Sequence, residues 1–147
     1  MTGKGENSLD GAVRLSRKLS DKKIEHGDVV LEVRDLAVRF WVNDDWFNAA
    51  QGLNYDLKAG EVLAIVGESG SGKTQSAMSL IGLLPKNGRA TGSAKLKGTE
   101  LIGMSLGQMQ HVRGNEISVI FQEPMTALNP VYTVGFQIVE TLRTHFL

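Results

Sequence analysis

The amino-acid sequence predicts an α/β fold that begins with antiparallel strands and continues with a glycine-rich loop between a strand and a helix. Apolar and polar residues alternate from Val29 onward, which is typical of strands with one buried face. Two short continuous apolar runs, at 62–66 and 117–121, are typical of strands that are buried on both faces. Apolar residues at helical spacing come after each run, so this part of the chain is expected to alternate strands with helices.

Length and composition limit the possible functions. The 147 residues are the size of one ordinary domain. Sixteen basic and sixteen acidic residues give a formal net charge of zero, so we expect no nucleic acid as a partner. The absence of cysteine excludes disulfides and thiolate catalysis. No apolar stretch approaches the ~18 residues of a membrane span and none resembles a signal peptide, so we expect a soluble, unexported protein.

The first 28 residues differ in composition from the rest. They are polar with mixed charge, and we expect a mostly disordered extension. An alternative is a short amphipathic helix at a membrane surface, because Ala12, Leu15 and Leu19 share a helical face beside basic residues. The predicted domain therefore covers residues 29–147.

Half-buried antiparallel strands are predicted over the first part of this domain. Alternating apolar residues form three sets, and the turn KAGE at 58–61 separates the last set from the run VLAIV at 62–66. The sets are Leu31 and Val33; Leu36, Val38 and Phe40; and Leu53, Tyr55 and Leu57.

Helices and further strands are predicted after residue 72. Ala77, Met78, Ile81 and Leu84 keep helical spacing until Pro85 is expected to stop the helix. Turns around one short strand are expected at 86–101, a short helix at 106–112, a buried strand at 117–121, a loop at 122–133, and an amphipathic helix that starts at Val134 and carries Ile138 and Leu142.

The glycine-rich loop has the spacing of a phosphate-binding motif. The segment GESGSGKT at 67–74 satisfies G-x-x-x-x-G-K-[ST], whose backbone N–H groups wrap the phosphates of a nucleotide. Lys73 is expected to reach the β- and γ-phosphate oxygens and Thr74 to offer its hydroxyl to Mg²⁺. The flanking strand and helix favour this interpretation over a glycine turn that matches by chance. The residues expected to bind the nucleotide are Gly67, Ser69, Gly70, Ser71, Gly72, Lys73, Thr74 and Gln75.

Other kinds of site find little support in the sequence. His26, His111 and His145 share no metal-ligand spacing and are expected at the surface. No Ser-His-Asp set and no paired carboxylates stand out.

Three segments resemble ATP-binding cassette (ABC) transporter ATPases, and more narrowly the ATP-binding subunits of dipeptide and oligopeptide importers. They are LEVRDLAVRF, LNYDLKAGEVLAIVGESGSGKTQSAMSLIGLLP and ISVIFQEPMTALNPVYTVGFQI, and the resemblance covers residues 29–147. The fold that the resemblance implies is a P-loop NTPase of the ABC type with an antiparallel β subdomain.

The resemblance also implies roles for residues outside the loop. Gln122 matches the glutamine that contacts Mg²⁺ or the attacking water, and together with Lys73 it is the expected catalytic residue. Phe40 matches the aromatic residue that stacks on adenine, although its position on an alternating strand also fits a core phenylalanine. Trp41, Trp46 or Phe47 could serve in its place.

Partners and location follow from the same resemblance. The implied ligands are ATP and Mg²⁺, and the implied activity is coupling of ATP hydrolysis to the import of peptides or related small solutes. The implied partners are a second ABC ATPase subunit, transmembrane permease subunits docking near Tyr132, and indirectly an extracytoplasmic substrate-binding protein. The expected location is peripheral, at the cytoplasmic face of the cell membrane.

The sequence departs from intact ABC ATPases in one respect. It contains neither the LSGGQ signature nor a Walker B strand, so we expect a C-terminally truncated core that is marginally stable and inactive in hydrolysis alone. Two alternatives remain. The chain could bind ATP without hydrolysing it, or it could be a P-loop kinase, for which the arginine-rich lid expected after the second buried strand is absent from 122–133.

Overall fold

The computed structural model describes residues 23–123 and 127–146. The predicted disordered extension at 1–28 and the alternative amphipathic helix around Leu15 fall mainly or wholly outside these residues. The expected strands, turns and helices of the domain fall within them, apart from residues 124–126 of the loop after the second apolar run.

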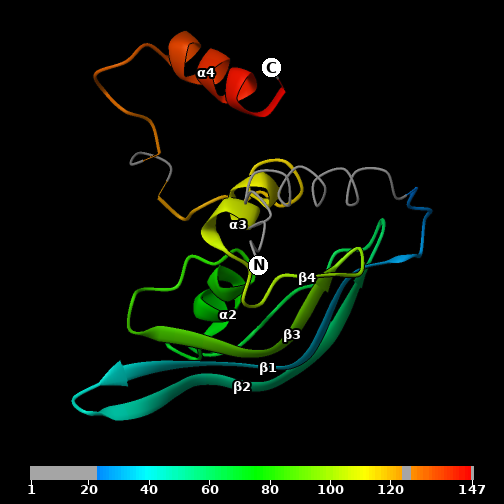
Figure 1. Cartoon of the computed structure of the whole chain (residues 1–147), viewed down its shortest axis with the longest axis vertical. Coiled ribbons are helices and arrows are strands. Elements are labelled where there is room, and N and C mark those ends of the chain that lie inside the picture. The colour runs from blue at the N-terminus through cyan, green and yellow to red at the C-terminus, as the bar shows by residue number, and fades with distance from the viewer. Residues whose placement is uncertain (1–22, 124–126, 147) are drawn as a thin grey trace, which may run out of the picture.

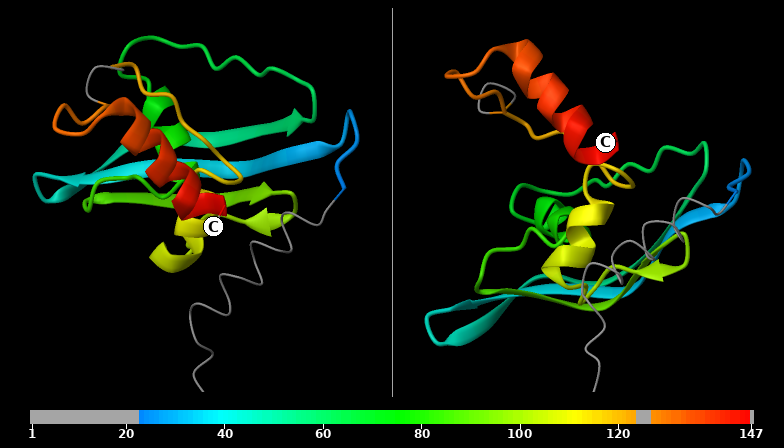
Figure 2. Two further views of the ribbon diagram at one scale, coloured as in Figure 1. Left: turned by 90° about the horizontal axis from the view of Figure 1, so that it is seen from above. Right: turned by 45° about the horizontal axis from the view of Figure 1, so that its top comes forward.

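A curved antiparallel sheet of four strands, in the order β2-β1-β3-β4, is the base of the fold (Figure 1). Helices α2 and α3 lie on the same side of this sheet, and α4 stands apart from it at the far end of the molecule (Figures 1 and 2). The strands are β1 Val29–Val42, β2 Asp45–Lys58, β3 Gly88–Leu96 and β4 Thr99–Glu100; the helices are α2 Lys73–Leu80, α3 Leu106–Val112 and α4 Val134–Phe146.

The first two strands form one long hairpin. Asn43 and Asp44 link them with φ angles of 50° and 60°, the left-handed conformation of a two-residue hairpin turn. This confirms the predicted half-buried antiparallel strands, but as two continuous strands of 14 residues in place of three shorter sets. A register shift near Asp35 keeps both halves of β1 on the core side, so Val33 and Leu36 are both fully buried although they are three residues apart.

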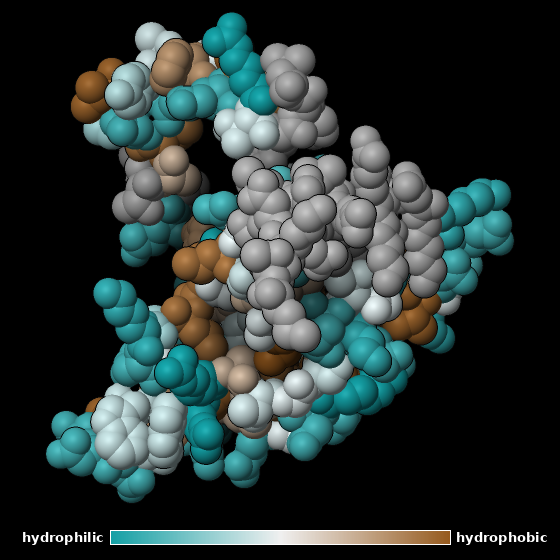
Figure 3. Space-filling model, viewed as in Figure 1, coloured by the Kyte–Doolittle hydropathy of each residue, from teal (hydrophilic) through white to brown (hydrophobic). Residues whose placement is uncertain are grey.

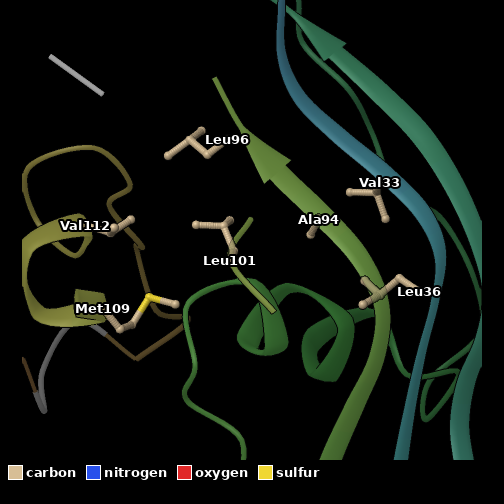
Figure 4. Packing of buried hydrophobic residues seen from close by; sticks show 7 residues of the cluster. All are labelled: Val33, Leu36, Ala94, Leu96, Leu101, Met109 and Val112. Atoms are coloured by element: carbon tan, nitrogen blue, oxygen red, sulfur yellow. The ribbon is translucent and has the colours of Figure 1, made fainter. Parts of the chain in front are cut away.

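The core lies between the sheet and α3. It consists of seven buried side chains: Val33, Leu36, Ala94, Leu96, Leu101, Met109 and Val112 (Figure 4). Helix α3 has the predicted bounds because Ser105 and Gln108 form a reciprocal capping box at its start. The capping box therefore fixes the start of α3, and the buried side chains of Met109 and Val112 pack it against the sheet.

The two continuous apolar runs are not strands, which makes that prediction wrong. Val62 is 94% exposed and Ile120 is 98% exposed, and an isolated bridge from Arg113 to Ile117 is the only β pairing that either run makes in the described chain. A strand buried on both faces needs neighbouring strands at its edges and layers on its faces. The described residues supply neither.

Helix α2 ends earlier than predicted. Gly82 has a φ of 62°, its N–H donates to Ser79 O, and the N–H of Leu83 donates to Met78 O, which is the Schellman arrangement that closes a helix. The helix therefore stops at Leu80, four residues before Leu84, and does not reach Pro85. Of the apolar residues that define its predicted pattern, Ile81, just beyond the helix, is buried, whereas the buried side chains within the helix are Ser76 and Ser79.

Helix α4 confirms the predicted helix from Val134. The apolar side chains that define its pattern, Val134, Ile138 and Leu142, are each more than half exposed. None of the described helices has the length and apolar character needed to cross a membrane.

Candidate nucleotide-binding site

The glycine loop packs against the edge of β2 directly before α2. Gly70 and Gly72 have φ angles of 80° and 83°, which side chains rarely tolerate. A Cβ on Gly72 would lie 2.2 Å from the carbonyl oxygen of Ala49, and one on Gly67 would lie 2.7 Å from Ser71 Oγ. Glycine is therefore required at position 72 by the close approach of the Ala49 backbone, whereas at position 70 it is favoured by the positive φ alone and the Ser71 hydroxyl could rotate away from a side chain at position 67.

Lys73 holds its charge inside this loop. It is the first residue of α2, and its ammonium Nζ donates to Gly67 O at 2.7 Å, to Glu68 O at 2.6 Å and to Ser71 Oγ at 3.3 Å. These hydrogen bonds hold the ammonium group of Lys73 against the start of the loop. The N-terminus of α2 adds its partial positive charge at the same place.

A cavity of about 300 Å³ joins the loop to the aromatic residues of the hairpin. Phe40 and Phe47 are directly opposite one another in the β1–β2 register, so their side chains share the face of the sheet that faces the loop. The cavity is lined by Phe40, Phe47, Ala49, Gly70, Ser71, Gly72, Lys73, Thr74 and Gln75.

The structure separates the four aromatic candidates into two pairs. Trp41 and Trp46 are the next pair in the register, and strand alternation places them on the opposite face from the cavity. Phe40 is half-buried because its ring packs against Gly88 of β3, where an added Cβ would lie 2.8 Å from ring atom Cε1. Phe47 is 63% exposed. The pairing of Phe47 with Phe40 is not among the expectations from the sequence, although the Asn-Asp turn signal between them predicts this register.

Other expected site residues do not line the cavity. Gly67 and Ser69 belong to the loop but are absent from the lining, and Gln122 is exposed in a bend of the segment that follows the second apolar run. The resemblance implies a role for Gln122 directly after a strand at 117–121. Because that strand is not formed, the structure does not bring the side chains of Gln122 and Lys73 together in the cavity.

Lys73 is the one charged side chain among the described residues that line the cavity. The described residues also contain no group of three or more His, Asp or Glu side chains that could hold a metal ion. His26 is exposed and His111 is half-buried in the last turn of α3, whereas the side chain of His145 falls outside the described part. The charge of Lys73 makes the cavity suited to an anion.

A second cavity, of about 350 Å³, lies between α2, α3 and β3. Leu101, Met104 and Met109 contribute apolar walls to it, Arg89 and Arg113 also border it, and none of the site residues expected from the sequence lines it. The phosphate-loop cavity, although slightly smaller, is thus the one that combines a fixed cation with glycine backbone and aromatic rings.

Comparisons with known proteins identify relatives of this chain. The oligopeptide transport ATP-binding protein OppD of Mycobacterium tuberculosis (strain ATCC 25618 / H37Rv) is 50% identical over 116 residues, which are 79% of this chain and 19% of the relative. OppD of Escherichia coli (strain K12) is 47% identical over 121 residues, 82% of this chain and 36% of the relative. The dipeptide transport ATP-binding protein DppD of Haemophilus influenzae is 43% identical over 117 residues, 79% of this chain and 36% of the relative.

The matched region thus spans between about a fifth and about a third of the length of these relatives. The family pattern described as ABC transporter matches residues 50–142, which include the whole glycine loop and α2. Since this match covers more than half of the chain and contains the loop that holds Lys73, the chain belongs to the ABC transporter family.

Proposed function

We propose that this chain binds ATP with Mg²⁺ and is part of the ATP-binding subunit of an ABC importer for peptides or related small solutes. The observation that carries the proposal is the cavity in which Phe40 and Phe47 meet the loop residues from Gly70 to Gln75. The printed names of the relatives, oligopeptide and dipeptide transport ATP-binding proteins, support peptides as the transported class.

Each part of the cavity has a role in this proposal. The backbone N–H groups of the loop from Gly67 through Ser69 and Ser71 cradle the phosphates, and Lys73 balances their charge. Phe40 stacks on adenine. Thr74 holds Mg²⁺ through its hydroxyl, with Gln122 as a further ligand in the intact subunit, and a hydroxyl oxygen is a suitable hard ligand for this ion. When bound, Mg²⁺ neutralises part of the charge on the phosphate oxygens.

The larger assembly is part of the same proposal. Residues 29–147 form the N-terminal part of an ABC nucleotide-binding domain, and Lys73 and Gln122 act in hydrolysis by the intact subunit. That subunit pairs with a second ATPase subunit and docks on transmembrane permease subunits at the cytoplasmic face of the membrane. An extracytoplasmic substrate-binding protein takes part indirectly.

A second candidate function is ATP binding without hydrolysis by the 147-residue chain alone. It is favoured by one observation: no carboxylate is among the described residues that line the cavity, and Gln122 is not among them either. Hydrolysis needs a group that orients the attacking water, and a phosphate-binding loop by itself does not supply one.

The test is calorimetric titration of the 147-residue chain with Mg·ATP. Lys73→Ala is expected to weaken binding by about 10-fold or more, because a charge-assisted hydrogen bond contributes roughly 1.5 to 3 kcal/mol. Lys86→Ala is the matched control, since Lys86 is exposed and outside the cavity. Equal affinities of Lys73→Ala and the original chain would refute the proposed site. A phosphate-release assay on the same samples separates the two candidate functions.

A further inference from the structure

The face of the sheet that is turned away from the helices carries an unusual group of side chains near the hairpin turn. Arg39 of β1 and Arg89 of β3 are direct partners in the strand register, and Trp41 and Trp46 are direct partners between β1 and β2. Strand alternation places Arg39 and Trp41 on the same face, opposite to Val38 and Phe40. We call these four residues, Arg39, Arg89, Trp41 and Trp46, the arginine–tryptophan face.

Two like charges occupy partner positions here, and neither has an ion-pair partner among the described residues. Side chains of direct cross-strand partners are about 4.5 to 5.5 Å apart at Cβ, and like charges at that position are destabilising. Neither Arg39 nor Arg89 forms an ion pair or a hydrogen bond through its guanidinium within the described part of the chain, and both are exposed. Arg34, on the same strand, shows the contrast: its guanidinium donates to both carboxylate oxygens of Asp56, at 2.6 and 3.0 Å.

One of the two cations, Arg39, makes a cation–π contact with a tryptophan ring. The guanidinium carbon of Arg39 lies 4.6 Å from the centre of the Trp46 ring, and the Trp41 and Trp46 rings meet edge to face at 5.3 Å and 65°. A guanidinium held over a ring keeps its N–H donors free for an acceptor. The indoles remain 44% and 37% exposed, so apolar surface adjoins the two cations.

We propose that the arginine–tryptophan face binds a short acidic segment of a partner protein, with carboxylates on Arg39 and Arg89 and an apolar side chain on the indoles. Arginine and tryptophan are enriched among the residues that carry most of the energy of protein interfaces. A bound carboxylate would relieve the repulsion between the two guanidinium groups.

Charge near the face favours a short acidic peptide over a polyanion. Asp44 and Asp45 occupy the hairpin turn and the start of β2, directly beside Trp46. A nucleic-acid backbone or an anionic membrane extends beyond the two arginines and would meet these carboxylates, whereas a segment of a few residues need not.

Tryptophan fluorescence gives a specific test, because the chain has two tryptophans and both belong to this face. The probe is a synthetic peptide with one leucine between two pairs of glutamates, titrated into the full 147-residue chain at low ionic strength. We expect a saturable change in emission and weaker binding at higher salt. Arg39→Gln and Arg89→Gln should each weaken binding at least 5-fold, and the double variant at least 20-fold.

Arg143→Gln is the matched control, because Arg143 is an exposed arginine on α4 and is not part of the arginine–tryptophan face. It should leave the affinity unchanged, and a thermal melt of each variant confirms that it is folded. Three outcomes would overturn the proposal: no saturable binding, equal affinity in the double variant, or tighter arginine-dependent binding of an oligothymidylate or of phosphatidylserine vesicles than of the peptide.

Discussion

Two positions of the glycine loop need glycine for different reasons, although their backbone angles are similar. Gly70 and Gly72 both have a φ near 80°, yet an added Cβ on Gly70 would meet no atom within 4 Å, whereas one on Gly72 would collide with the backbone of Ala49. The motif spacing predicts glycine at both positions without this distinction. The difference arises from β2, which is distant in sequence and close in space.

The first prediction compares these two glycines. Gly70→Ala should destabilise the chain by about 1 to 2 kcal/mol, the cost of a left-handed conformation for an L-residue. Gly72→Ala should cost more, because a Cβ 2.2 Å from Ala49 O forces the loop or β2 to move. Urea unfolding without nucleotide measures both. Equal free energies of unfolding in the two variants would show that the loop does not pack on β2 in solution.

At the site, expected residues that are local to the motif line one cavity, whereas one whose position depends on distant strand pairing does not. Lys73, Thr74 and Gln75 line the cavity because the loop and the first turn of α2 are fixed locally. Phe40 reaches it through the hairpin. Gln122 does not line it, because its predicted position required a strand that the described residues do not form.

Among the elements, α2 is contacted at its end by an arginine that follows α3. Arg113 follows α3 and donates from Nε to Ile81 O at 2.7 Å and from a terminal nitrogen to Gly82 O at 2.8 Å. These carbonyls follow the last turn of α2, and the contact ties the phosphate-loop helix to the core beneath α3.

The second prediction follows from this contact. Arg113→Met keeps much of the apolar stem but removes both donors, so the free energy of unfolding should fall by about 1 to 3 kcal/mol. Amide exchange should become faster in α2 than in β1 and β3. Arg143→Met, on the exposed face of α4, is the control and should change little. Unaltered stability of Arg113→Met would mean that Gly82 alone is sufficient to close α2.

Strand β4 ends with a carboxylate, Glu100, that accepts hydrogen bonds from β3. Burial alone would raise the pKa of Glu100, but hydrogen bonds from the Ser93 hydroxyl and from the N–H groups of Ala94 and Ile102 lower this pKa below its ordinary value near 4.5. The ionised form therefore joins the two strands.

The third prediction is the pH dependence that results. A carboxylate with a lowered pKa contributes stability above its ordinary pKa, and this contribution is lost as the pH falls from about 4.5 through the lowered value. Glu100→Gln should be less stable at pH 7 and should lose less stability on acidification. Asp56, whose pKa is also lowered by its hydrogen bond from Arg34, retains its share in that variant. Acid unfolding curves identical to those of the original chain would contradict this role of Glu100.

Elements with local signals were predicted well, and elements without them were not. Helix α3 has the predicted bounds because Ser105 and Gln108 cap it. The end of α2 was placed too late, because Gly82 is a stronger stop than Pro85 once its positive φ is known. The run at 62–66 is apolar enough for a strand, but strand formation requires hydrogen-bonding partners that a periodic pattern cannot specify.

On the scale of the whole molecule, apolar side chains are divided between a small core and a large exposed surface. The core is confined to the space between the sheet and α3. Val62, Val66 and Ile120 are each at least 88% exposed, and apolar residues lie open in the middle of the face shown in Figure 3. Exposed apolar patches of this kind, next to backbone without ladder partners, are sites of association.

The fourth prediction is that the 147-residue chain associates with itself as its concentration rises, through the segments at 62–66 and 117–121. The double variant Val66→Ser, Ile120→Ser should shift this association to higher concentration, measured by light scattering, while changing the free energy of unfolding of the dilute monomer by less than about 0.5 kcal/mol. Leu101→Ala is the contrasting core change: Leu101 is 1% exposed, so the loss should be about 2 to 5 kcal/mol with no relief of association. If Val66→Ser and Ile120→Ser instead destabilise the monomer as strongly as Leu101→Ala, both segments are packed in solution, and the exposed apolar surface is not what drives association.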